Sequence, residues 1–201
     1  MKYLENIQEV AALQPDYLGF IFYEKSKRNF DGIIPELPEA IKKTGVFVNA
    51  ALVEIIGKIN RYDLQAIQLH GDESVDFILE LKTKINSSIE IIKVFGIKHQ
   101  FNFEDIKPYE KVVDYFLFDT KGKERGGNGI TFDWTVLKKY PSTKPFFLSG
   151  GIGLEQIEEV KEIMNSNLPV YALDVNSQFE IEAGLKSKNR LQQFKEALYG
   201  E

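Results

Sequence analysis

The chain has 201 residues, 43% hydrophobic and 27% charged, which is enough to bury the core of one globular domain. Its net charge of −5, with acidic and basic residues interleaved, provides no broad cationic face, so we expect no nucleic-acid partner. The absence of cysteine excludes disulfides and thiolate metal sites from these residues, and no apolar run is long enough to span a bilayer. With no signal-peptide pattern at the N-terminus, we expect a cytoplasmic protein without a membrane partner.

Along the chain, short apolar runs alternate with stretches of helical spacing. A helix is predicted first, because Leu4, Ile7, Val10 and Ala11 share one helical face and Pro15 ends the run. Seven strands are predicted after it, at residues 17–22, 44–49, 66–71, 89–97, 114–120, 144–152 and 169–177. Helices are predicted between and after them at residues 51–60, 74–85, 103–109, 154–164 and 189–198, with weaker helical patterns at 38–42 and 134–140.

Strands separated by helices indicate parallel βαβ units. The predicted strands are apolar along most of their length, which is typical of strands covered on both faces. A closed (βα)8 barrel and an open doubly wound sheet both satisfy this pattern. The barrel is favoured because the strand spacing is short and even and no strand is followed by a GxGxxG turn. We therefore predict a single (βα)8 TIM-type barrel domain over residues 1–201.

A barrel of this type needs eight strands, and the sequence predicts seven. The chain opens on a helix where a strand is expected, so strand 1 is the one missing from these residues. A genuine seven-stranded form would expose sheet edges on the strands at 17–22 and 169–177, where other chains could pair.

Polar and glycine residues gather just past the carboxyl ends of the predicted strands. In a barrel these positions share one face, where the active sites of this fold are built. The residues concerned are Arg28, Asn49, His70, Gly71, Asp119, Thr120, Gly150, Gly151, Asp174, Asn176 and Ser177.

Three of these side chains suggest chemistry, each beside a structural alternative. Asp119 ends a strongly apolar strand, where partial desolvation favours the protonated carboxyl and suits it to general acid catalysis; the alternative is a loop cap. His70 is either a group that polarises a ligand or a hydrogen-bonded residue at a strand end. Arg28 lies among lysines and is either a solvated loop residue or a guanidinium that holds a substrate carboxylate.

Two glycine-rich segments favour ligand binding. Residues 148–152, LSGGI, open onto a predicted helix and offer backbone N–H groups to a phosphate, as do Asn176 and Ser177 in the following DVNS segment. A tight turn is the structural alternative for Gly150 and Gly151. Residues 126–134, GGNGITFDW, are interpreted as a lid over the ligand, with an ordinary surface loop as the alternative. The lid glycines are Gly126, Gly127 and Gly129.

Together these motifs resemble the phosphoribosylanthranilate isomerases, (βα)8-barrel enzymes of tryptophan biosynthesis. The resemblance extends from about residue 1 to residue 200 and is carried, in order, by GFIFYEKSKR, GVFVN, IQLHG, LFDT, GGNGITFDW, LSGGI and ALDVNS. It implies an Amadori rearrangement of N-(5'-phosphoribosyl)anthranilate to 1-(2-carboxyphenylamino)-1-deoxyribulose 5-phosphate. This reaction needs no cofactor and no metal, and its partner is a small phosphorylated substrate.

The resemblance also implies roles for individual residues. Asp119 matches the general acid of the family, and Arg28 matches the arginine that meets the anthranilate carboxylate. Asp174 and His70 match residues that line the same pocket, and the phosphate-binding loops are matched by Gly150, Gly151, Asn176 and Ser177.

The general base of the family is a cysteine in a K-x-C-G-[IM] pattern at the end of strand 1, and this sequence contains neither that strand nor a cysteine. Two explanations are left open. Either Met1-Lys2 is an internal part of a longer CGMK segment, or the gene encodes a seven-stranded form. The leading hypothesis is an isomerase, and this 201-residue form is expected to be much slower because it lacks the base. The second hypothesis is a non-catalytic barrel that binds phosphosugars. A different phosphate-binding barrel enzyme is a third hypothesis, and no sequence feature marks an oligomer interface.

Overall fold

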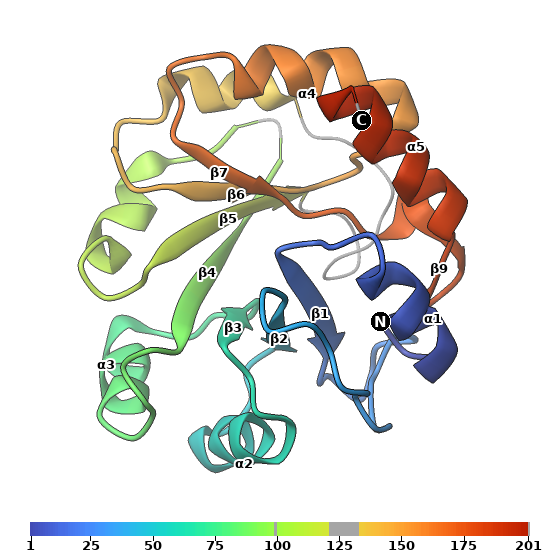
Figure 1. Ribbon diagram of the computed structural model, residues 1–201. Helices are drawn as coiled ribbons and strands as arrows, with labels where there is room; N and C mark the ends of the chain where they lie inside the picture. The colour runs from blue at the N-terminus through green and yellow to red at the C-terminus, as the bar shows by residue number, and fades with distance from the viewer. Residues whose placement is uncertain (99, 121–132, 201) are drawn as a thin grey trace. The chain divides into compact units, whose positions relative to one another are not determined.

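The computed structural model describes residues 1–98, 100–120 and 133–200, in which strands and helices alternate along the chain (Figure 1). Seven parallel strands form one sheet, hydrogen-bonded in sequence order from β1 to β7. The α/β class and the strand order therefore agree with the alternation in the sequence. The chain divides into two compact units, Met1–Ile92 with Glu180–Lys188, and Lys93–Phe179 with Asn189–Glu201.

The elements follow one another closely within each unit. The first unit contains α1 (Leu4–Ala11), β1 (Tyr17–Ile21), β2 (Lys42–Phe47), α2 (Leu52–Tyr62), β3 (Ala66–Leu69), α3 (Val75–Lys82) and the hairpin of β8 (Glu180–Glu182) and β9 (Leu185–Lys186). Strand β4 (Glu90–Ile97) begins in the first unit and ends in the second. The second unit contains η1 (Phe103–Tyr109), β5 (Tyr115–Thr120), η2 (Trp134–Lys139), β6 (Phe146–Leu148), η3 (Leu154–Gln156), α4 (Ile157–Met164), β7 (Val170–Leu173), η4 (Ser177–Phe179) and most of α5 (Lys188–Tyr199).

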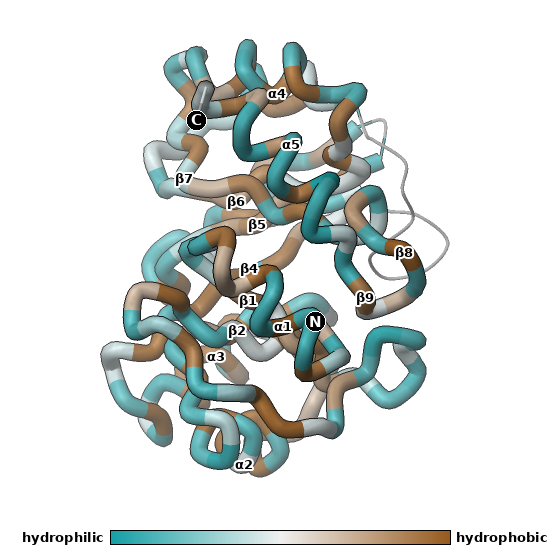
Figure 2. The backbone as a smooth tube through the Cα atoms, turned by 45° about the vertical axis from the view of Figure 1, so that its right-hand side comes forward, coloured by the Kyte–Doolittle hydropathy of each residue, from teal (hydrophilic) through white to brown (hydrophobic). Residues whose placement is uncertain are grey.

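The core of the first unit lies between β1–β3 and the helices that follow them. All four residues of β3 are buried, as expected for a strand covered on both faces. Helix α2 buries Ile55, Ile59 and Tyr62, one amphipathic stripe, and the change from brown to teal along its tube can be followed in Figure 2. The Tyr62 ring stacks on Phe22 with centroids 5.1 Å apart, which fixes α2 against the end of β1.

The outer edge of β1, which faces away from β2, is partly covered within the first unit. The Met1 amino group donates a hydrogen bond to the Gly19 carbonyl oxygen at 2.6 Å. The Phe30 N–H donates to the Ile21 carbonyl oxygen at 2.8 Å, and Asn29 forms a parallel bridge with Ile21. The exposed edge predicted on residues 17–22 is therefore satisfied at two of its carbonyl groups.

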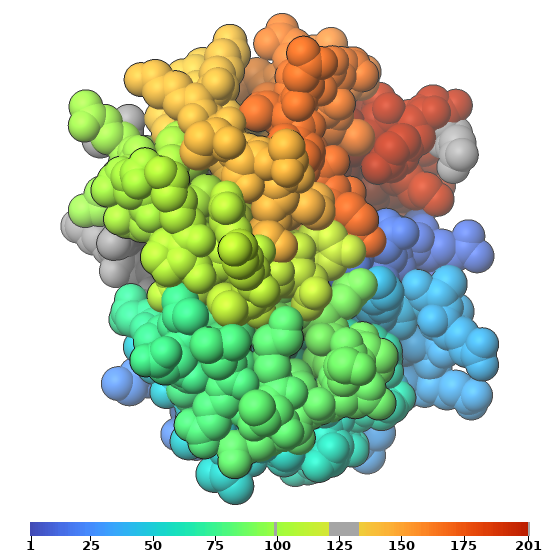
Figure 3. Space-filling view, turned by 90° about the vertical axis from the view of Figure 1, so that its left-hand side faces the viewer, coloured from blue at the N-terminus to red at the C-terminus, as the bar shows by residue number. Residues whose placement is uncertain are grey.

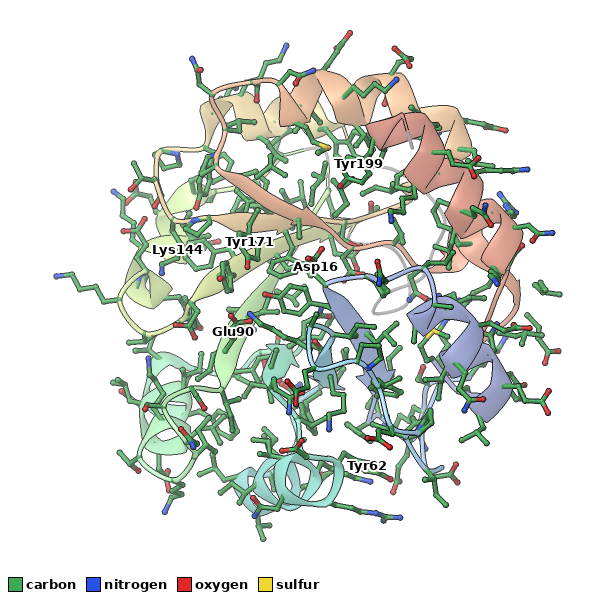
Figure 4. The ribbon with its side chains drawn as sticks, viewed as in Figure 1. Asp16, Tyr62, Glu90, Lys144, Tyr171 and Tyr199 are labelled. Carbon is green, nitrogen blue, oxygen red and sulfur yellow. The ribbon has the colours of Figure 1, made fainter. Side chains whose placement is uncertain are left out.

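Aromatic rings fill the core of the second unit. Phe118 of β5 lies edge-on to Phe146 of β6 with centroids 5.1 Å apart. Every residue of β6 is buried, whereas every residue of β7 is at least partly exposed, which fits the place of β7 as the last strand of the sheet. Tyr171 of β7, labelled in Figure 4, is 46% exposed although its ring stacks on Tyr115 at 4.3 Å.

Two predicted helices are present in a tighter form. Residues 103–109 and 134–139 form 3-10 helices rather than α-helices. Pro108 lies inside the first of them and has no N–H to donate, which disfavours a longer α-helical ladder. The predicted helix at 154–164 begins as the 3-10 turn η3 and becomes α-helical at Ile157.

The weak helical pattern at residues 38–42 is wrong. A turn closes there, with the Ile41 N–H donating to the Pro38 carbonyl oxygen, and Lys42 already belongs to β2. The Lys42 N–H bonds to the Asp16 carbonyl oxygen beside β1 and is therefore not available to a helix. Lys42, the last residue of the predicted helix, is therefore part of the sheet.

The predicted helix at 74–85 is shorter in the structure and lies at the surface. Helix α3 buries Ile78 and Leu81 and leaves Leu79 46% exposed, and its residues form part of the face shown in Figure 3. None of the helices in the described residues is both long enough and apolar enough to cross a membrane.

Candidate functional site

The carboxyl end of β5 carries the predicted general acid. Asp119 is 8% exposed, and its Oδ1 accepts a hydrogen bond from the Thr120 N–H at 2.8 Å. Apolar strand residues Phe116, Leu117 and Phe118, all fully buried, precede it. The backbone N–H of the next residue thus orients the Asp119 carboxyl at the end of a buried strand, and a proton donor needs a defined orientation.

The loop after β6 turns tightly on two glycines. Gly150 and Gly151 have φ values of 90° and 72°, a left-handed conformation that other residues rarely adopt. A Cβ atom on Gly150 would lie 2.7 Å from the Thr120 backbone nitrogen and closer still to Oγ1 of the same residue. Glycine at position 150 therefore lets this loop approach the residue next to Asp119.

The loop after β7 lies against the loop after β6. The Asp174 N–H donates to the Leu148 carbonyl oxygen at 2.8 Å, which continues the sheet to the start of this loop. A Cβ atom on Gly153 would lie 3.2 Å from Cβ of Gln178, which follows Asn176 and Ser177. The Phe179 N–H donates to the Asn176 carbonyl oxygen and closes the short helix η4. The structure thus brings together the two loops predicted to bind phosphate.

Arg28, in the first unit, is held by an ion pair that the sequence analysis did not foresee. Its Nε donates to both carboxylate oxygens of Glu180, at 3.0 and 2.9 Å, and its Nη2 donates to Oε2 at 2.6 Å. Lys186 Nζ also donates to Oε1 of Glu180 at 2.9 Å. The Glu180 side chain is 6% exposed. Burial raises the pKa of Glu180, but the hydrogen bonds from Arg28 and the charge of Lys186 outweigh it and lower the pKa to about 2.

His70, also in the first unit, lies at the end of β3 beside a second buried carboxylate. Its backbone N–H donates to the Phe47 carbonyl oxygen at 2.8 Å. Glu73 is 5% exposed and accepts hydrogen bonds from the backbone N–H groups of Gly71 and Asn49. This carboxylate ties together the loops after β2 and β3.

Sequence reasoning missed both Glu180 and Glu73. Glu73 precedes the Ser74 cap of α3, and an acidic residue at the start of a helix is usually explained by the helix alone. Arg28 and Glu180 are 152 positions apart, so no local pattern connects them.

Of the predicted lid at residues 126–134, only Asp133 and Trp134 belong to the described part of the chain. Gly126, Gly127 and Gly129 lie outside the described residues. Beyond them, Asp133 caps η2 by accepting a hydrogen bond from the Thr135 N–H at 3.0 Å, and Trp134 is 5% exposed. Among the described residues no group of histidine and carboxylate side chains is arranged to hold a metal ion.

Comparison with known proteins relates this arrangement to one family. The family model for N-(5'-phosphoribosyl)anthranilate (PRA) isomerase matches residues 1–197. The N-(5'-phosphoribosyl)anthranilate isomerase of Parabacteroides distasonis is 43% identical over 202 aligned positions, which cover 96% of this chain and 88% of that protein. The chain belongs to the phosphoribosylanthranilate isomerase family. The family resemblance carried by the sequence motifs is thereby confirmed.

Solved phosphoribosylanthranilate isomerases share the fold. The crystal structure from Thermus thermophilus superposes with a TM-score of 0.81 at 25% identity and covers all of this chain and 94% of that one. A phosphoribosylanthranilate isomerase in complex with reduced 1-(o-carboxyphenylamino)-1-deoxyribulose 5-phosphate gives a TM-score of 0.79 at 26% identity, over 99% of this chain and 95% of that one. The family thus consists of isomerases of tryptophan biosynthesis with this α/β fold, and this chain is one of its members.

Proposed function

We propose that this protein catalyses the Amadori rearrangement of N-(5'-phosphoribosyl)anthranilate to 1-(2-carboxyphenylamino)-1-deoxyribulose 5-phosphate, without a cofactor, as a cytoplasmic enzyme. The observation that carries the proposal is the meeting of the loops after β6 and β7 next to the Asp119–Thr120 strand end, in a chain that the family model covers from residue 1 to 197. One loop pair and one carboxyl then supply two of the functions that the reaction needs, anion binding and proton donation.

In this proposal the substrate phosphate is bound by Gly150, Gly151, Asn176 and Ser177. Left-handed glycines expose backbone N–H groups without a Cβ in the way, and such groups bind anions well. A phosphate fixed in this way orients the ribose ring for reaction, which lowers the entropic part of the barrier.

Asp119 is proposed to act as the general acid. Its carboxyl proton passes to the furanose ring oxygen, the bond between C1' and that oxygen breaks, and the substrate nitrogen shares its electron pair to form the Schiff base. A general base then takes the C2' proton to give an enolamine, which tautomerises to the ketose. Asp174 and His70 are proposed to contact the substrate, and Arg28 to bind its anthranilate carboxylate.

The reaction also needs a general base. The family uses a cysteine in a K-x-C-G-[IM] pattern, and these 201 residues contain no cysteine. We propose that the full fold is a single (βα)8 barrel domain whose first strand is not among these residues. Such a strand would pair at the outer edge of β1, where the carbonyl groups of Gly19 and Ile21 point away from β2. Among the described residues, Met1 and Phe30 donate hydrogen bonds to these two groups.

Turnover tests the proposal directly. Phosphoribosylanthranilate is incubated with this chain and with a form extended upstream to include any K-x-C-G segment read in frame, and the product is separated and quantified. We expect turnover by the extended form and a rate lower by about 10² to 10⁴ without the base. Equal turnover by both forms would contradict the placement of the base, and binding without turnover by both would make the protein a phosphosugar-binding barrel.

A further inference from the structure

Among the described residues, the Arg28 guanidinium is held along one edge only. Its Nε and Nη2 atoms face the Glu180 carboxylate side-on, while its side chain is 19% exposed. A guanidinium carries five N–H groups in a rigid plane, so an edge-on carboxylate uses two of them and leaves Nη1 directed elsewhere. No hydrogen bond from Nη1 to any of the described residues is present, and Arg28 therefore retains donors for a second anion.

Glu180 is itself held rigidly by the hairpin of β8 and β9. Its Oε1 accepts hydrogen bonds from Lys186 Nζ at 2.9 Å and from the Gly184 N–H at 3.0 Å. Gly184 has a φ of 89°, which turns the hairpin so that its N–H points back at Glu180. The carboxylate that receives Arg28 is thus fixed from the opposite side by backbone and side chain.

The hairpin is in turn fixed to the first helix. The Lys186 N–H donates to Oδ1 of Asn6 at 2.7 Å, and Nδ2 of Asn6 donates to the Lys186 carbonyl oxygen at 2.8 Å. Asn6 is 3% exposed, so these two bonds are shielded from water. A continuous series of contacts therefore runs from α1 through Lys186 and Glu180 to Arg28, all within the first unit.

We propose that Glu180 is a positioning residue for substrate recognition, which holds one edge of the Arg28 guanidinium so that the opposite edge binds the anthranilate carboxylate. This inference rests on the proposed function. An unheld arginine samples many rotamers and loses that freedom on binding, whereas a guanidinium already fixed by Glu180 loses little. Lys186 offsets the negative charge of Glu180, so the three side chains together carry a net charge of +1 and remain attractive to an anion.

The proposal predicts an effect confined to the carboxylate of the ligand. Binding of reduced 1-(o-carboxyphenylamino)-1-deoxyribulose 5-phosphate and of its analogue without the carboxyl group is measured by calorimetry on the unmodified chain, on Glu180→Gln and on Arg28→Met. We expect both variants to bind the carboxylated ligand about 10- to 100-fold more weakly, the range for a hydrogen bond to a charged group. The analogue should lose no more than about threefold in affinity, since the contact that positioning serves is absent from it.

Glu90→Gln is the matched control. Glu90, labelled in Figure 4, forms a comparable ion pair with Lys42 and accepts a hydrogen bond from Tyr17 in the same unit, but it lies at the start of β4. We expect this variant to bind both ligands as the unmodified chain does. The double variant Arg28→Met/Glu180→Gln should bind the carboxylated ligand no more weakly than Arg28→Met alone, because Glu180 acts through Arg28.

Three outcomes would overturn the inference. Equal losses for the two ligands in Glu180→Gln would assign the ion pair a structural role only. Additive losses in the double variant would mean that Glu180 does not act through Arg28. Failure of the unmodified chain to bind either ligand would contradict the proposed function itself. If circular dichroism shows that Glu180→Gln does not fold, Glu180→Asp replaces it, since a shorter carboxylate keeps the charge but withdraws from Nε and should give the same selective loss.

Discussion

Replacement of Gly150 by alanine should damage both the stability of the protein and its proposed phosphate site. At a φ of 90° an L-residue with a Cβ costs about 1–2 kcal/mol more than glycine. The new Cβ would also lie 2.7 Å from the Thr120 backbone nitrogen and nearer still to its Oγ1, and a clash with backbone cannot be relieved by a rotamer change. Overpacking of this kind costs about 1–3 kcal/mol. We therefore expect Gly150→Ala to lower the free energy of unfolding by about 2–5 kcal/mol.

Urea denaturation at neutral pH measures this loss, with Gly57→Ala as the control. Gly57 lies inside α2, and a Cβ there would meet nothing within 4 Å, so alanine should stabilise the protein by up to about 1 kcal/mol. Adding Thr120→Ala to Gly150→Ala removes Oγ1 and should recover part of the loss, while the clash with the backbone nitrogen persists. A Gly150→Ala variant within about 0.5 kcal/mol of the unmodified chain would refute the geometry of this loop.

Further predictions concern the general acid Asp119, the ion pair of Glu180, and the contact between the loops after β2 and β3. Asp119→Asn in the form extended upstream should lower turnover by about 10² to 10⁴ while leaving the affinity for the reduced product analogue nearly unchanged, and near-normal turnover would remove Asp119 from the acid role. Because the folded-state pKa of Glu180 lies at about 2, below the ordinary value of 4.5, its contribution is complete above pH 4.5 and is lost as the pH falls towards 2. Between pH 6 and 2.5, the free energy of unfolding of Glu180→Gln should therefore fall by about 3 kcal/mol less than that of the unmodified chain, as measured by urea denaturation. An unchanged pH dependence would contradict the ion pair. Gly71→Ala places a Cβ 2.6 Å from the Asn49 backbone nitrogen and should lower the thermal midpoint by several degrees, whereas an unchanged midpoint would mean that the loops after β2 and β3 are not held this closely.

The sequence predicted the strands well because burial on both faces leaves a strong local signal. Residues 115–118 of β5, YFLF, and the buried AIQL of β3 are apolar at nearly every position. The ends of the strands were less certain. Strand β2 begins at Lys42 instead of residue 44, since backbone pairing with β1 extends past the apolar residues that the pattern detects.

The helical predictions were inexact where backbone hydrogen bonding decides the form, and one of them, at residues 38–42, was wrong. Pro108 in η1 and the turn before Lys42 lie in segments whose side-chain spacing suits a helix, yet the hydrogen bonds go elsewhere. The hairpin of β8 and β9 was missed because its strands have three residues and two, too short for an alternation to be recognised.

Some residues of the proposed site could be predicted from the sequence and others could not. Asp119, Gly150 and Asn176 could be selected from the sequence because each lies at or just past the carboxyl end of an apolar strand in a parallel sheet. The partner of Arg28 could not, since Glu180 lies in a hairpin that belongs to the first unit although it follows the last strand of the sheet in the sequence. A contact between such distant positions depends on tertiary packing, which local spacing does not encode.

The most direct test of the central claim is the conversion of phosphoribosylanthranilate by the form of this protein extended upstream, with its Asp119→Asn variant assayed in parallel. We expect the extended form to produce 1-(2-carboxyphenylamino)-1-deoxyribulose 5-phosphate. The variant should produce at least about a hundredfold less, on the order of the contribution of one general acid. No product from the extended form, or equal product from both, would contradict it.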